Sequence, residues 1–122
     1  MDNKTLGNKG ERLAAEYLGS HGYRIVETNY RCQFGEIDII ASRGDLLVFA
    51  EVKTRRSLRF GRPGEAVDFC KQRKITRTAA WYIHGKKLDN CHFRFDVLEI
   101  LRSPAGQMSL NHIKNAFEAV WV

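Results

Sequence analysis

Residues 35–53 read GEIDIIASRGDLLVFAEVK, and this stretch decides the fold. Its apolar runs predict two β-strands, over residues 36–41 and 46–54, because short apolar runs bounded by turn signals are typical of buried strands. Between them, Gly44-Asp45 has the composition of a two-residue hairpin turn. We therefore expect the two strands to form an antiparallel hairpin.

The rest of the chain adds two helices and three strands around this hairpin. Residues 8–20 carry an apolar stripe at helical spacing, and Gly22 follows it as a stop signal. We expect helices over 8–20 and 65–84, strands over 23–30, 93–101 and 108–113, a loop over 57–64, and a short helix or strap over 116–121. The order αβββαββ predicts an α/β fold, with a central mixed sheet flanked by helices, in a single domain over residues 1–122.

The composition is that of an ordinary soluble domain. Of 122 residues, 43% are hydrophobic and 28% are charged, and no apolar run approaches the roughly 18 residues that suggest a membrane span. The polar N-terminus has no signal-peptide core. The three cysteines are odd in number and form no C-x-x-C pair, which favours reduced thiols. We expect a cytoplasmic protein with no disulfide and no membrane association.

Positive charge is concentrated in one segment. The net charge of the chain is +6, and residues 53–77 hold nine Lys or Arg against two acids, which leaves the remaining chain near neutral. Such a segment favours a polyanionic partner, because phosphate contacts supply most non-specific nucleic-acid affinity. We expect the partner to be nucleic acid, with DNA as the first choice. The alternative is a solvated basic face that only keeps the protein soluble.

Two acids interrupt the apolar strands of the hairpin. With Gly44-Asp45 as the turn, Asp38 faces Glu51. Directly opposed side chains lie about 5 Å apart at Cβ, and like charges there are destabilising. A divalent cation between the two carboxylates would remove the repulsion, and Mg²⁺ prefers one or two carboxylates together with water and phosphate oxygens. The pair therefore predicts a site for Mg²⁺ or Mn²⁺.

Three further residues are expected to face the same site. Lys53 lies two positions after Glu51, so it shares a strand face with it and could orient a water or stabilise charge on a phosphate. Glu11 falls on the inward stripe of the first helix, and Gln72 has the same spacing on the second. Together they predict one catalytic face beside the basic segment.

Each of these residues also has an ordinary structural interpretation. Glu51 and Lys53 could form an exposed ion pair worth at most about 1 kcal/mol. Glu11 could be an acid that the helix dipole favours in a first turn, and Gln72 could simply lie on the surface. We interpret the histidines His21, His84 and His112 as helix-end or surface residues.

The spacing of these residues resembles a known nuclease signature. Asp38, twelve intervening residues and then Glu51-Val52-Lys53 are similar to the PD-(D/E)xK motif. Additional matches identify the chain as similar to the YraN-like family of uncharacterised bacterial proteins, and they lie at Gly7–Glu11, Asn29–Cys32, Gly35–Asp38, Phe49–Arg55 and Ala66–Asp68. The likeness spans residues 7–120. Ile37 departs from the signature, because it stands where the motif has proline.

The resemblance implies a fold and a set of roles. The fold is a restriction-endonuclease-like αβββαβ core, shared with Holliday-junction resolvases. Asp38, Glu51 and the backbone carbonyl of Val52 would bind the metal, and Lys53 would be the catalytic lysine. Glu11 matches an acid of the resolvase branch, and Gln72 matches a polar residue carried by several branches.

The resulting hypothesis is a metal-dependent nuclease that hydrolyses phosphodiester bonds in DNA. The residues expected to hold the DNA backbone are Arg55, Arg56, Arg59, Lys71, Lys74 and Arg77. Since such contacts read phosphate rather than base edges, we expect selection by DNA structure. A homodimer would cover more duplex than one 14.0 kDa unit. The alternatives are a non-catalytic nucleic-acid-binding protein that retains the nuclease fold, and an adaptor that binds a partner through Phe117, Val120 and Trp121.

Overall fold

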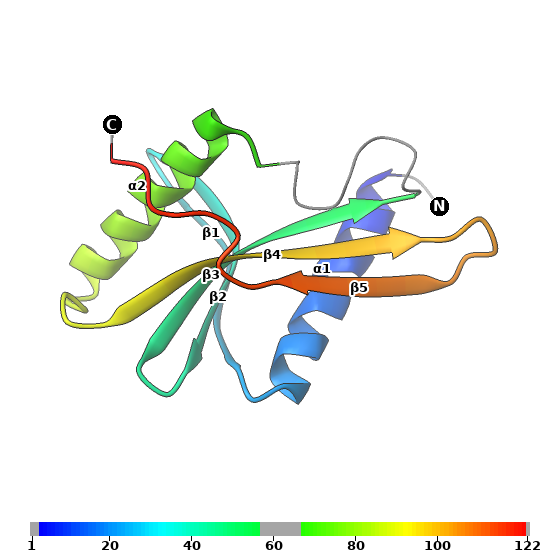
Figure 1. Ribbon diagram of the computed structural model, residues 1–122, viewed down its shortest axis with the longest axis horizontal. Coiled ribbons are helices and arrows are strands. Elements are labelled where there is room, and N and C mark those ends of the chain that lie inside the picture. The colour runs from blue at the N-terminus through cyan, green and yellow to red at the C-terminus, as the bar shows by residue number, and fades with distance from the viewer. Residues whose placement is uncertain (1–2, 57–66, 122) are drawn as a thin grey trace.

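The computed structural model describes residues 3–56 and 67–121, with side chains from Leu6 onward in the first range. These ranges contain two helices and one five-stranded sheet (Figure 1). The elements are α1 (Asn3–Ser20), β1 (Arg24–Cys32), β2 (Gly35–Arg43), β3 (Leu46–Arg55), α2 (Phe69–Gly85), β4 (His92–Arg102) and β5 (Met108–Ile113). This order confirms the predicted α/β fold with an αβββαβ core.

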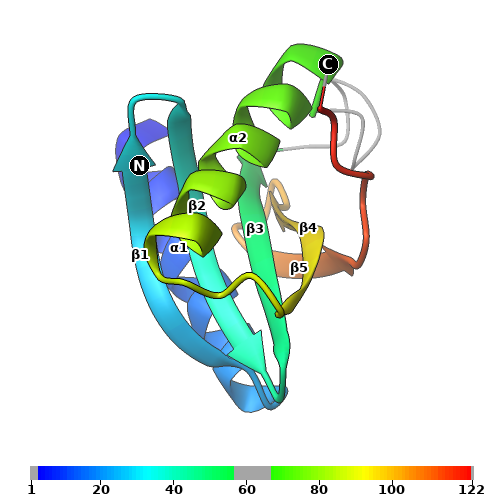
Figure 2. The same ribbon diagram turned by 90° about the vertical axis from the view of Figure 1, so that its left-hand side faces the viewer.

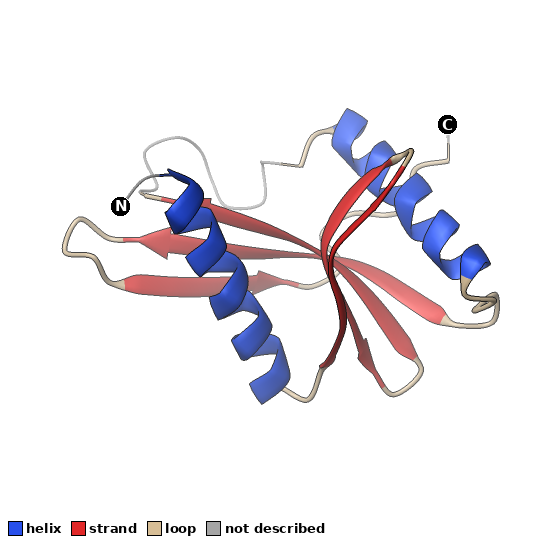
Figure 3. Cartoon of the chain, turned by 180° about the vertical axis from the view of Figure 1, so that it is seen from behind, coloured by secondary structure: helices blue, strands red, loops and turns tan. Residues whose placement is uncertain are grey.

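The sheet is mixed, and its strands lie in sequence order from β1 to β5. Neighbouring strands are antiparallel except β3 and β4, which are parallel and are connected through α2. A parallel pair needs a crossover, and a helix is its usual form. The two helices cover opposite faces of the sheet: α2 lies in front of β1–β3 in Figure 2, and α1 lies in front of the sheet in Figure 3.

Each helix buries an apolar stripe against its own face of the sheet. Ala14 and Leu18 of α1 are fully buried against one face. On the other face, Ile75, Ala79 and Tyr82 of α2 are buried, as their helical spacing predicts. Full burial of one such large apolar side chain contributes about 1.5–3 kcal/mol. These two cores fix the sheet between the helices.

The predicted register of the central hairpin is confirmed. Arg43 pairs with Leu46 across the two-residue turn, and the pairing continues with the same offset to Ile39 opposite Ala50. Gly44 has a φ of +59° in this turn, which is the left-handed region that glycine adopts without strain. The ladder ends one position before Asp38 and Glu51.

Two helix boundaries differ from the sequence expectation. Helix α1 begins at Asn3 rather than residue 8. Helix α2 begins at Phe69, because the Asp68 side chain caps it by accepting a hydrogen bond from the Lys71 N–H at 2.8 Å. The expected start at residue 65 and the loop over 57–64 lie outside the described residues.

The segment after β5 is a strap without helical turns, which decides between the two expected forms. The Phe117 ring stacks on Phe95 with centroids 4.8 Å apart. The Val120 N–H donates to the Thr76 hydroxyl at 3.0 Å, which ties the strap to α2 (Figure 1). Within the described ranges, neither helix is long and apolar enough to cross a membrane, and all three cysteines are free thiols. The cytoplasmic location and the homodimer stay predictions.

Candidate active site

The strands β2 and β3 stop pairing where the two acids lie. Asp38 has no Cα partner in the ladders that β2 forms with β1 and β3. Its carboxylate instead accepts a hydrogen bond from the Val52 N–H, with 2.8 Å between Oδ2 and N. A side chain therefore takes the place of a backbone rung, which holds the Asp38 carboxylate between the two strands.

Glu51 is buried and contacts two lysines. The Lys53 ammonium lies 3.4 Å from Oε1 of Glu51, so the two residues share a strand face as the alternation predicts. Lys71, from the first turn of α2, lies closer, with 2.7 Å between Nζ and the same oxygen. Only 6% of Glu51 is exposed. Its charge is therefore neutralised largely by protein groups rather than by water.

Burial and a neighbouring negative charge both change the pKa of Asp38. Burial and the neighbouring Glu51 carboxylate raise the pKa of Asp38 from 3.8 to about 7, with Glu11 adding to the shift, although the Val52 N–H partly opposes them. Burial alone would lower the pKa of Lys71, but the carboxylates of Glu51 and Asp38 outweigh it and raise that pKa. The site therefore combines a carboxyl that exchanges protons near neutral pH with the Lys71 ammonium, whose raised pKa keeps it charged.

Glu11 comes to the site because α1 approaches the sheet closely at Gly10. A Cβ at Gly10 would overlap the Thr54 hydroxyl, so only glycine fits this contact. The next residue, Glu11, is half-buried and lines a cavity of about 230 Å³ together with Asp38. The predicted inward position of Glu11 is thus confirmed, and its catalytic role stays a prediction.

Gln72 is half-buried in the first turn of α2, one residue after Lys71. Its side-chain amide donates to the Val67 carbonyl at 3.0 Å, which stabilises the chain before the helix. The partner in this hydrogen bond is the backbone before α2 and not one of the two acids. Convergence on the site is therefore observed for Glu11, Asp38, Glu51 and Lys53, and the role of Gln72 stays a prediction.

The residues expected to bind nucleic acid lie in several places. Lys74 and Arg77 are exposed on α2, Arg56 is exposed directly after β3, and Arg55 is half-buried at its end. Arg59 lies outside the described residues. Lys71 reaches into the site itself, a contact that no sequence pattern indicated because it depends on how α2 docks.

Asp96 in β4 is a further buried acid, and it was not among the residues predicted from the sequence. Only 1% of it is exposed. Arg94 donates to both oxygens at 2.7 and 2.8 Å, the Asn115 N–H donates to Oδ1 at 3.0 Å, and His112 Nε2 lies 2.7 Å from Oδ2. The surface interpretation of His112 was therefore wrong. The available signal was an acid inside the apolar run 93–101, the same pattern that singled out Asp38.

The Asp96 carboxylate is saturated with hydrogen bonds. Burial by itself would raise its pKa, but the hydrogen bonds from His112, Arg94 and Asn115 outweigh burial and lower that pKa. His112 in turn lies 3.1 Å from the Tyr17 hydroxyl through Nδ1. These contacts tie α1, β4 and the turn after β5 together, so their geometry fits a structural role.

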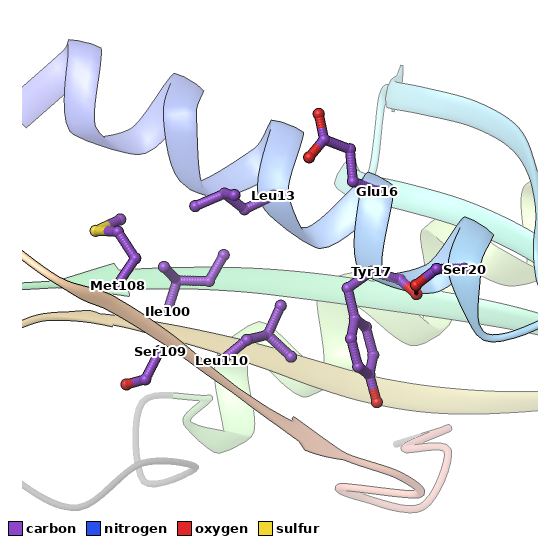
Figure 4. A pocket seen from close by; sticks show the side chains of 8 residues that line it. All are labelled: Leu13, Glu16, Tyr17, Ser20, Ile100, Met108, Ser109 and Leu110. Atoms are coloured by element: carbon purple, nitrogen blue, oxygen red, sulfur yellow. Dashed lines mark hydrogen bonds between the residues drawn. The ribbon is translucent and has the colours of Figure 1, made fainter.

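An apolar cavity of about 410 Å³ opens between α1, β4 and β5 (Figure 4). Its apolar lining includes Leu13, Ile100, Met108 and Leu110. None of the residues predicted for catalysis lines it. The chemistry-bearing groups are therefore at the divergence of β2 and β3 rather than in this cavity.

The donor set at that divergence fits a hard divalent cation. Asp38 and Glu51 offer carboxylate oxygens, which Mg²⁺ and Mn²⁺ prefer. The raised pKa of Asp38 reflects burial first and repulsion by Glu51 second, and a bound cation would relieve that repulsion. Among the described residues, no group of three or more His, Cys, Asp or Glu is arranged to hold a metal. A cation here would therefore rely on two carboxylates completed by backbone, water or substrate oxygens.

The structure defines an α/β protein with a five-stranded mixed sheet and two helices, and its αβββαβ order is compatible with a nuclease-like core. The model of the uncharacterised protein family UPF0102 matches residues 10–100, and the chain belongs to this family. A UPF0102 protein of Caldicellulosiruptor saccharolyticus is 48% identical over 96% of this chain and 100% of its own length. Those of Dictyoglomus turgidum and Alkaliphilus metalliredigens are 47% and 49% identical, over 96% and 94% of this chain and 100% and 99% of theirs.

Proposed function

We propose that this protein is a metal-dependent nuclease that hydrolyses phosphodiester bonds in DNA and selects its substrate by structure, as resolvases do. The observation that carries the proposal is the meeting of Asp38 and Glu51 at the point where β2 and β3 separate, with Lys53 at 3.4 Å from Glu51. Two acids and a lysine on neighbouring strands are the groups that the nuclease signature requires.

Each residue has a definite task in this proposal. Asp38 and Glu51, with the Val52 carbonyl, would hold Mg²⁺ or Mn²⁺, which when bound supplies Lewis-acid stabilisation of a phosphate and lowers the pKa of a water. The Val52 N–H keeps the Asp38 carboxylate in place between the strands. Lys53 places an ammonium beside Glu51, where it orients the attacking water or stabilises charge on the phosphate.

The DNA backbone would lie against the exposed cations around this site. Lys74 and Arg77 are exposed on α2, the helix whose Lys71 reaches Glu51, and Arg56 follows the strand that carries Glu51 and Lys53. Contacts of this kind bind phosphates without reading base edges. Substrate choice therefore falls to the shape of the DNA.

A second candidate function is non-catalytic nucleic-acid binding. It is favoured by the ion pair between Lys71 and Glu51, because an ammonium 2.7 Å from the carboxylate satisfies Glu51 without any metal. In that case the acids would stabilise the fold, and binding would depend on salt but not on divalent cations.

Calorimetric titration with Mg²⁺ and Mn²⁺ separates the two functions. The wild type should bind metal, and Asp38→Ala and Glu51→Ala should both abolish binding because each removes one of two carboxylate ligands. The titration is repeated with an uncleavable duplex present, since substrate oxygens complete the site. Asp45→Ala is the matched control, because Asp45 is an exposed acid in the β2–β3 turn.

The same variants are then tested on linear, branched and single-stranded DNA. Asp38→Ala and Glu51→Ala should lower cleavage at least about a thousandfold while DNA binding remains, since only the chemistry is lost. Unchanged cleavage in both variants would refute the assigned site. Absence of metal binding even with DNA would leave the non-catalytic function.

A further inference from the structure

Asn29 lies opposite Asp38 and has an unusual backbone. The β1–β2 ladder pairs Thr28 with Ile39 and Tyr30 with Ile37, so Asn29 falls between these pairs, facing Asp38. Its φ is +52°. This left-handed conformation is uncommon for any residue with a side chain, although Asn tolerates it better than most. Strained backbone inside a strand is enriched at functional sites.

The irregular backbone lies on the edge strand β1, beside the candidate active site. Asn29 is exposed, and it lines the same cavity of about 230 Å³ that contains Asp38 and Glu11. This cavity lies between the first half of α1 and strands β1 and β2. A group bound in it would sit directly against the Asp38 carboxyl.

The lining of the cavity combines hydrogen-bond donors with the two acids. Asn8 and Asn29 contribute carboxamides, Thr28 a hydroxyl and Arg12 an exposed guanidinium. A guanidinium binds phosphate in a fork geometry, and carboxamides can bind both donors and acceptors on bases and sugars. The lining thus offers one guanidinium, two carboxamides and a hydroxyl beside two carboxyl groups, a mixture of donors and acceptors that matches the phosphate, sugar and base of a nucleotide.

The size of the cavity favours part of a polymer over a free metabolite. Sites for small molecules usually enclose about 300–1,000 Å³, and this cavity encloses about 230 Å³. One sugar or base of a longer strand fits such a volume while the rest of the strand lies outside it.

We propose that this cavity is a nucleotide subsite, in which Asn29 positions the substrate strand next to the phosphodiester held at Asp38. Arg12 binds the neighbouring phosphate of the same strand. The inference rests on the proposed nuclease function, because that function brings a nucleic-acid strand to Asp38. It adds a positioning residue on β1 to the acids and lysines of β2, β3 and α2.

The variants for the test use a matched pair of asparagines. Asn29→Gly removes the carboxamide, and glycine adopts a φ of +52° freely. Asn115→Gly makes the same change at a φ of +53°, in the turn after β5 and outside the cavity. Asn29→Asp keeps the shape of the side chain but replaces its donors with negative charge. Thermal unfolding of all three shows whether each variant folds.

Binding is measured with a fluorescent 12-nucleotide DNA, single-stranded and as a duplex, in buffer containing EDTA. Asn29→Gly should raise the Kd about tenfold, the effect of losing one hydrogen bond to a charged or buried partner. Asn29→Asp should raise it further, and Asn115→Gly should leave it unchanged within about twofold. The single-turnover cleavage rate at saturating DNA should change less than the Kd, since the Asn29 contact is made equally in the bound and the reacting strand.

Equal Kd values for Asn29→Gly and Asn115→Gly would overturn the subsite and leave Asn29 with a backbone role only. Cleavage by the wild type is scored separately in Mg²⁺. If the wild type cleaves but Asn29→Gly binds normally, the nuclease function stands and the subsite is refuted. If the wild type fails to cleave, the nuclease function is refuted, and a tenfold loss of binding in Asn29→Gly still supports the nucleotide subsite.

Discussion

Two buried acid clusters in the same sheet behave in opposite ways. What we term the Asp96 cluster consists of Asp96 and its partners Arg94, His112 and Asn115. The hydrogen bonds of these partners satisfy the Asp96 carboxylate and lower its pKa. The Asp38 cluster consists of Asp38, Glu51, Lys53 and Lys71. Its two carboxyl groups lie close together, and burial and their repulsion raise the pKa of Asp38 to about 7. Both clusters interrupt apolar strands.

The difference lies in how far each carboxylate is satisfied by the protein. Asp96 receives every hydrogen bond from fixed neighbours, so the folded chain prefers it charged. Asp38 accepts a hydrogen bond from the Val52 N–H, and the like charge of Glu51 lies nearby. An acid whose charged form the fold leaves destabilised, such as the half-buried Asp38, is a candidate for function, whereas a buried acid with all its hydrogen bonds, such as Asp96, stabilises the fold.

The largest contrast in stability is expected between Asp96→Asn and Asp38→Asn. Asp96→Asn should lower the free energy of unfolding by about 3–5 kcal/mol, because the amide turns donors toward the donors of Arg94 and His112. In EDTA at pH 8, Asp38→Asn should leave stability unchanged or raise it, since it removes a repelled charge and keeps an acceptor for Val52. Urea unfolding measures both.

In domains near this size, each kcal/mol of lost unfolding free energy lowers Tm by about 2–8 °C. Asp96→Asn should therefore lower Tm by about 10 °C or more. Asp45→Asn, in the exposed turn between β2 and β3, is the control, with an expected change within about 0.5 kcal/mol. If Asp38→Asn also lowered the free energy of unfolding by several kcal/mol, both clusters would stabilise the fold, which would contradict the difference proposed between them.

The pH dependence of stability should separate the clusters next. In metal-free protein the folded state holds the Asp38 proton more tightly than the unfolded chain, because the folded pKa is about 7 instead of 3.8. The free energy of unfolding should therefore fall between about pH 4 and 7, by about 4 kcal/mol at about 1.4 kcal/mol per unit of pKa difference. Asp38→Asn should abolish this fall.

Asp96 acts in the opposite direction. Its folded pKa lies below the ordinary value, so it stabilises the fold above about pH 4, and that stability is lost as the pH falls further. Urea unfolding from pH 3 to 8, with EDTA present, measures both the fall in stability between pH 4 and 7 and the loss of stability below about pH 4. The same fall between pH 4 and 7 in wild type and Asp38→Asn would assign it to another group.

The smallest effect is expected from removing the lysine that neutralises Glu51. Lys71→Met should lower the free energy of unfolding by about 1 kcal/mol, because the Lys71 side chain is 44% exposed and Lys53 remains 3.4 Å from Glu51. Lys74→Met, on the exposed face of the same helix, should change it by less than about 0.5 kcal/mol. If Lys71→Met lowered the free energy of unfolding as much as Asp96→Asn does, the Asp38 cluster would have a structural role, and non-catalytic nucleic-acid binding would be favoured.

The sequence predicted the central part of this molecule well. A two-residue turn at Gly44-Asp45 fixes which positions oppose each other, and the observed register from Arg43 to Ile39 follows from it. Strand alternation placed Lys53 beside Glu51, and helical spacing placed Glu11 inward. These are local rules, because each depends on a few residues of one element or one turn.

Other features depend on contacts between elements far apart in the chain. Lys71 reaches Glu51 only because α2 docks on the face that Glu51 shares. His112 is buried because β5 pairs with β4 and brings it to Asp96. Asn29 faces Asp38 with a left-handed backbone only after β1 has paired with β2. No spacing within one segment encodes such neighbours.

The sequence by itself determined the order of the elements, the hairpin register and the convergence of Asp38, Glu51 and Lys53. Hydrogen-bonded turns and side-chain periodicity act over a few residues, and the composition records them directly. Only the tertiary structure decided which buried acid is satisfied and which is not. Burial and hydrogen bonding of a carboxylate are sums over all surrounding elements, so the same apolar strand pattern yields a structural Asp96 and a perturbed Asp38.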